Sequence, residues 1–60
     1  MGAMEDLMRE ALSKREVARA LRLNAPGLSL VEARTQLLRY ASDLEHEADR
    51  LEAKARALKG

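Results

Sequence analysis

The feature that most constrains this chain is a seven-residue repeat of leucine in its second half. Leucine occupies every seventh position, and alanine fills most of the positions midway between; the leucines are Leu30, Leu37, Leu44, Leu51 and Leu58, and the alanines are Ala41, Ala48 and Ala55. Apolar residues spaced alternately three and four positions apart lie on one face of a helix, and this spacing is typical of helices that pack against other helices. The repeat therefore predicts a long amphipathic helix from Leu30 to Leu58.

The composition indicates an all-α protein. Ala, Leu, Arg, Glu and Lys make up 40 of the 60 residues, and Cys, Phe and Trp do not occur. This bias is typical of long helices and coiled coils, and the missing Cys excludes a disulfide framework. A chain of this length forms at most one domain, and a fold this small normally needs a partner subunit.

Net charge and hydropathy argue against two classes of partner, polyanions and membranes. The formal net charge is +1, which implies no general attraction to polyanions. No apolar run approaches the length of a membrane span, so we expect a cytoplasmic protein without a membrane partner.

The first half predicts a second helix, from about Glu5 to Leu23. Residues 1–3 look like a cloning remnant, which leaves residues 4–60 as a single helical-hairpin domain. Ser13 and Glu16 match a capping box, so this helix is either broken near Ser13 or continuous. The lack of Gly and Pro there favours continuity.

Pro26 and Gly27 predict a tight turn between the helices. We expect Asn24 to Leu28 to be non-helical and Ser29 to be the N-cap of the second helix. So short a connection joins antiparallel neighbours, so the chain is expected to form an antiparallel helical hairpin. Folding about Pro26 would place Ala11 near Ala41 and Met4 near Ala48.

In this register the C-terminal end of the long helix has no cover within one chain. We therefore expect two hairpins to dimerise into a four-helix bundle. The predicted dimer interface comprises Leu44, Ala48, Leu51, Ala55 and Leu58. A parallel in-register pairing of long helices would bring Glu47 against Glu52, which favours an antiparallel partner, although both orientations stay open. Tyr40 is expected to cover the hairpin core.

The sequence offers little catalytic chemistry. His46 lies near Asp43 and Asp49 on one predicted helix face, but a lone His among flexible acids is typical of a solvated surface. We expect no enzyme activity, no metal site and no cofactor. Four cations form a basic cluster on the first helix: Lys14, Arg15, Arg19 and Arg22. They suit contact with nucleic-acid phosphates, or else they form a face that is simply solvated or that pairs with the acids between Asp43 and Glu52. We favour a face of the second kind, solvated or paired, over contact with nucleic acid.

Two resemblances keep nucleic-acid binding open. Residues 16–24, with apolar positions at Val17, Ala18 and Leu21, resemble the first helix and turn of bacterial helix-turn-helix repressors. This likeness implies a DNA-binding transcriptional regulator that uses residues 13–31. Residues 48–51, Ala-Asp-Arg-Leu, and the two-helix architecture are similar to the Rop family of plasmid RNA-binding dimers. That likeness implies an RNA-binding dimer.

The main prediction is a non-enzymatic helical homodimer. It would act as a protein–protein interaction or regulatory adaptor module, with another protein as its partner. The DNA-binding regulator and the RNA-binding dimer are the alternatives.

Overall fold

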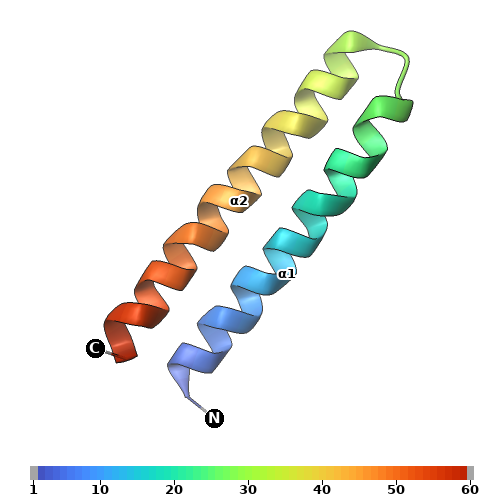
Figure 1. Cartoon of the computed structure of the whole chain (residues 1–60). Coiled ribbons are helices and arrows are strands. Elements are labelled where there is room, and N and C mark those ends of the chain that lie inside the picture. The colour runs from blue at the N-terminus through green and yellow to red at the C-terminus, as the bar shows by residue number, and fades with distance from the viewer. Residues whose placement is uncertain (1, 60) are drawn as a thin grey trace.

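The chain forms an antiparallel pair of helices (Figure 1). The computed structural model describes residues 2–59, with α1 at Ala3–Asn24, a short 3-10 helix η1 at Ala25–Gly27, and α2 at Val31–Lys59. The beginning of α1 and the end of α2 lie at the same end of the hairpin (Figure 1). The pair is long and thin, 45 × 15 × 10 Å. The all-helical hairpin predicted from the sequence is therefore confirmed.

Helix α1 runs without a break through Ser13, as the sequence favoured. It begins at Ala3, earlier than predicted, and the backbone N–H of Gly2 donates a 3.1 Å hydrogen bond to Glu5 Oε1. Glu5 and Asp6 lie in the first turn, where negative charge stabilises the helix dipole. Ala3 thus belongs to the first turn of the helix, and the assignment of residues 1–3 to a cloning remnant stays a prediction.

The connection between the helices differs from the predicted tight turn. Asn24 is helical, and η1 continues the path of α1 through Gly27 before Leu28 becomes extended, with ψ at 131°. Helix α2 begins at Val31, and the Arg34 N–H bonds to the Leu30 carbonyl at 3.1 Å. The position before the helix is thus Leu30, so the predicted N-cap at Ser29 is wrong by one residue.

This connection shifts the register of the hairpin. The chain does not reverse at Pro26, because η1 carries it onward and extended residues then advance about 3.3 Å each. As a result α2 extends past α1 at the turn (Figure 1). Met4 lines a hollow with Ala55 and Lys59 rather than lying near Ala48, and Ala18 rather than Ala11 packs near Ala41. The predicted overhang at the C-terminal end is therefore wrong; the overhang lies at the turn.

The core of the hairpin is a line of alanines. Three from the first half of the chain and three from α2, each set at intervals of seven, are at most 1% exposed; they are Ala11, Ala18 and Ala25, then Ala41, Ala48 and Ala55. Among residues 2–59, the one larger apolar side chain that is buried is Leu44, at 7% exposure. Alanine lets two helices approach closely, but each methyl removes little apolar surface from water.

Candidate functional site

The alanine line divides the hairpin into two sides. On a helix, the residue three positions after a given residue and the residue four positions after it lie on opposite sides of that residue's face. Six leucines lie on one side of the alanine line, and we call them the leucine side: Leu7, Leu21, Leu37, Leu44, Leu51 and Leu58. Four of them follow a buried alanine by three positions, and Leu7 and Leu37 lie on the same helix faces at multiples of seven residues from the others. On the other side, four charged residues each follow a buried alanine by four positions, and we call them the ion-paired side: Arg15, Arg22, Glu45 and Glu52.

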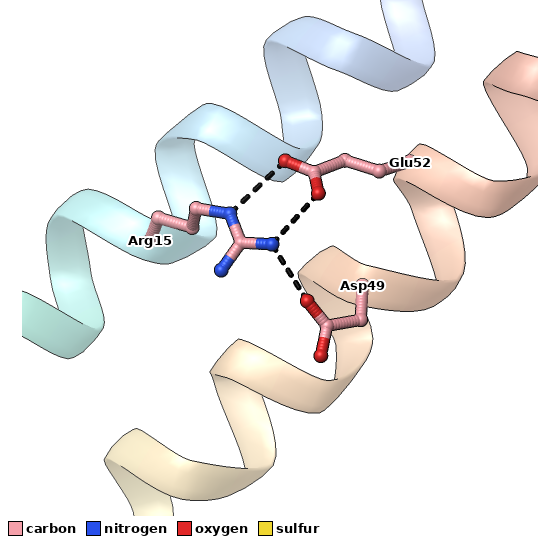
Figure 2. A network of polar contacts seen from close by, with 3 residues as sticks. All are labelled: Arg15, Asp49 and Glu52. Carbon is pink, nitrogen blue, oxygen red and sulfur yellow. Dashed lines mark hydrogen bonds and ion pairs between the residues drawn. The ribbon is translucent and has the colours of Figure 1, made fainter.

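Ion pairs join the two helices along the ion-paired side. The Arg15 guanidinium bonds Glu52 through Nε at 3.0 Å and through Nη2 at 2.7 Å, and the same Nη2 reaches Asp49 Oδ1 at 2.6 Å (Figure 2). The Arg22 guanidinium likewise donates two hydrogen bonds to the Glu45 carboxylate, from Nε at 2.8 Å and from Nη2 at 2.7 Å. Two-pronged contacts of this kind match the planar shapes of guanidinium and carboxylate, so they fix the relative position of the helices.

These contacts change the pKa of the groups that make them. Hydrogen bonding from Arg22 lowers the pKa of Glu45, and hydrogen bonding from Arg15 lowers the pKa of Glu52. The same bonds raise the pKa of both guanidinium groups. In each case the partner stabilises the charged form. Both acids therefore stay ionised to a lower pH than a free glutamate.

The leucine side is only partly covered. Leu7, Leu21, Leu37 and Leu51 are half-buried, and Leu58 is 57% exposed. Val17 and Tyr40, each one position before a buried alanine, flank this side and are 45% and 54% exposed. The prediction that Tyr40 covers the hairpin core is therefore wrong. The leucine side therefore presents a row of partly exposed apolar side chains, which the Lys14–Glu47 ion pair interrupts toward the end where α1 begins.

The residues predicted as a dimer interface fall into two groups. Ala48 and Ala55 are buried within one chain, because α1 lies alongside them. Leu51 and Leu58, on the leucine side, remain partly exposed, and Leu44 is nearly covered by the core. The expectation that α1 cannot reach this end of α2 is therefore wrong. It failed because it assumed reversal at Pro26.

Most of the predicted basic cluster is engaged with α2. In addition to the Arg15 and Arg22 contacts, Lys14 Nζ lies 2.9 Å from Glu47 Oε1, and this bond raises the pKa of Lys14. The fourth member, Arg19, is exposed. Of the two alternatives to nucleic-acid contact, a solvated face or a paired one, the structure shows pairing for three of the four cations. Contact with nucleic acid stays a prediction, and it would have to compete with these carboxylates.

The segment that resembles a helix-turn-helix does not form one. Residues 13–24 belong to the unbroken α1, so no turn occurs where that motif would require one. The helices of the hairpin also run antiparallel (Figure 1), whereas those of the motif cross at a steep angle. The loose match of apolar positions reflects an amphipathic helix.

No group of three or more His, Cys, Asp or Glu side chains within residues 2–59 is placed to hold a metal ion. Neither helix has a stretch that is both long enough and apolar enough to cross a bilayer.

Comparison with protein-family models, curated protein sequences and solved structures finds no significant match to this chain. The resemblance to the Rop family therefore stays an expectation from a short segment, and DNA binding stays a prediction that no relative supports.

Proposed function

We propose that this protein is a non-enzymatic interaction module that pairs its leucine side with a second copy to form a four-helix bundle. The observation that carries the proposal is the contrast between an alanine core and a row of partly exposed leucines. A second hairpin placed on that row would bury leucines from both copies, and full burial of each Leu contributes about 1.5–3 kcal/mol.

Stability supports the same arrangement. A chain of about 60 residues buries a small share of its surface and is marginal by itself. Here the buried apolar area is small, because six of the seven buried apolar residues within 2–59 are alanines. Dimerisation is a common way for so small a domain to gain a core.

Such a dimer would leave other surfaces free to act as an adaptor. Leu12, Leu23 and Val31 lie off the leucine side and are 60%, 73% and 65% exposed. Apolar side chains at an exposed helix face are typical anchors for a protein partner. The module would hold two identical faces outward, which suits a regulatory protein that brings partners together.

Lysine substitutions on the leucine side test the dimer. Val17 and Tyr40 are exposed in the single hairpin, so Val17→Lys with Tyr40→Lys should leave the helices intact. In the bundle, however, both ammonium groups would be buried without partners, which is strongly unfavourable. We expect the double variant to sediment as a monomer while its circular dichroism stays helical.

The matched control carries Leu12→Lys and Leu38→Lys. These residues are 60% and 41% exposed and lie off the leucine side. We expect this control to remain dimeric. Equal effects of the two double variants, or no effect of either on the solution mass, would contradict the proposed use of the leucine side.

A further inference from the structure

We infer that the second copy docks with its turn at the same end as the turn of the first. This inference rests on the proposed dimer and adds its orientation. It follows from an uneven distribution of charge along the leucine side.

The half of the leucine side near the turn is apolar. Leu21 packs against the cluster of Ala18, Ala41 and Leu44. Val17 and Tyr40 border this cluster as exposed apolar groups. A surface of this composition is best covered by another apolar surface.

The half near the chain termini carries charge of both signs. A hollow of about 400 Å³ lies there around Leu51, and charged residues of both helices line the rest of it: Glu10, Lys14, Glu47, Arg50 and Lys54. Of these, Lys14 and Glu47 already form a 2.9 Å ion pair. Acidic and basic side chains of α1 and α2 therefore lie at the same height along the hairpin axis.

Same-end docking matches both halves. A two-fold axis along the hairpin places α1 of one copy over α2 of the other, antiparallel and at the same level. Leu21 then meets Leu44 of the second copy. Glu10 meets Arg50 and Lys54 of the second copy, so opposite charges face each other across the interface.

Opposite-end docking matches neither half. Full overlap in that orientation would lay Val17, Leu21 and Tyr40 against the charged half of the second copy. Charged groups buried against leucine lose their hydration without gaining partners. The same-end arrangement is therefore the one that the charge distribution favours.

Spin labels at the turn distinguish the orientations. A side chain added at Gly27 meets nothing within 4 Å, so Gly27→Cys can carry a label without disturbing the fold. Pulsed electron paramagnetic resonance on the labelled dimer should give an interchain distance well short of the 45 Å length of the hairpin. A distance near or above that length would overturn the same-end orientation.

A mixed dimer provides the matched control. One copy carries the label at Gly27→Cys and the other at Ala57→Cys, an exposed position near the end of α2. The mixed dimer is isolated through a different affinity tag on each copy, so that the labelled homodimers are removed. Same-end docking predicts a long distance for this mixed dimer, and opposite-end docking predicts a short one. The loss of any interchain signal, with a monomeric mass, would instead contradict the dimer itself.

Discussion

The leucine side and the ion-paired side of this hairpin are built on the same two helices and the same alanine line, yet one is complete and the other is not. On the ion-paired side, Arg15 and Arg22 find their carboxylates within the chain. On the leucine side, four of six leucines are half-covered and Leu58 is mostly exposed. The two sides differ by only one position in the sequence, three or four residues after a buried alanine. One side sets the register of the helices, and the other is left without cover in the single chain.

The difference shows how stability and assembly are divided in a small chain. Exposed ion pairs contribute little to the free energy of folding, but they select one register between helices. Burial of apolar side chains supplies most of the stabilisation. In this chain we expect much of that burial to occur only when two copies assemble. We therefore expect substitutions on the leucine side to have much larger effects than substitutions on the ion-paired side.

The largest effect is expected for Leu51→Ala. At a protein concentration that maintains the dimer, removing this side chain should reduce the free energy of unfolding by about 2–5 kcal/mol. Leu12→Ala is the control, because Leu12 is 60% exposed and lies off the leucine side; it should change the value by no more than about 0.5 kcal/mol. Urea unfolding of the three proteins measures both changes. Equal losses of unfolding free energy in the Leu51→Ala and Leu12→Ala variants would show that no second chain covers the leucine side.

A smaller loss of stability is expected for a substitution in the alanine line, which both sides share. Ala18 is fully buried where α1 meets α2, so Ala18→Leu should force the helices apart and cost about 1–3 kcal/mol. Ala20 is exposed on the same helix, and Ala20→Leu should be nearly neutral. Thermal unfolding distinguishes the pair. A neutral Ala18→Leu would mean that the helices do not approach as closely as the alanine line indicates.

The ion-paired side should respond weakly and in a salt-dependent way. Arg15→Gln removes the contacts to Glu52 and Asp49, and we expect a lower melting temperature at low ionic strength, with the difference shrinking as salt is added. The shift should be smaller than that of Leu51→Ala. A shift as large as that one, or one that salt does not reduce, would reverse the proposed division between the two sides.

The smallest effect is a dependence on acid. The pKa of Glu45 and of Glu52 lies below the ordinary value of 4.5, mainly because Arg22 and Arg15 bond their charged forms. Their contribution is complete above that ordinary value and is lost as the pH falls through the lower folded-state pKa. Melting temperatures from neutral pH to about pH 3 should therefore fall less for a Glu45→Gln, Glu52→Gln variant than for the natural protein. Parallel curves would contradict the assigned pKa directions.

The sequence predicted the helices well and their register badly. The leucine repeat and the lack of strand-forming residues were enough for two antiparallel helices and for an unbroken α1. The register depended on Leu28 and Ala25, which decide where the chain reverses. Local turn preferences at Pro26 and Gly27 could not reveal that η1 continues along α1, because Ala25 is held by packing against α2.

The candidate site was predictable in part for the same reason. The leucine repeat indicated an apolar stripe, and the basic cluster indicated partners among the acids of α2. Which residues share a side depends on the register, so Ala48 and Ala55 were assigned to a dimer interface although they belong to the hairpin core. The matching intervals of Ala11, Ala18 and Ala25 with Ala41, Ala48 and Ala55 were the signal that could have fixed the register.

The most direct test of the proposed dimer is the mass of the natural chain in solution as it is diluted. Sedimentation equilibrium should give twice the 6.7 kDa chain mass at high concentration. The melting temperature should fall on dilution, because assembly stabilises the folded chain by mass action. A mass of 6.7 kDa at several hundred micromolar, together with a melting temperature that dilution leaves unchanged, would contradict a leucine side that is covered by a second copy.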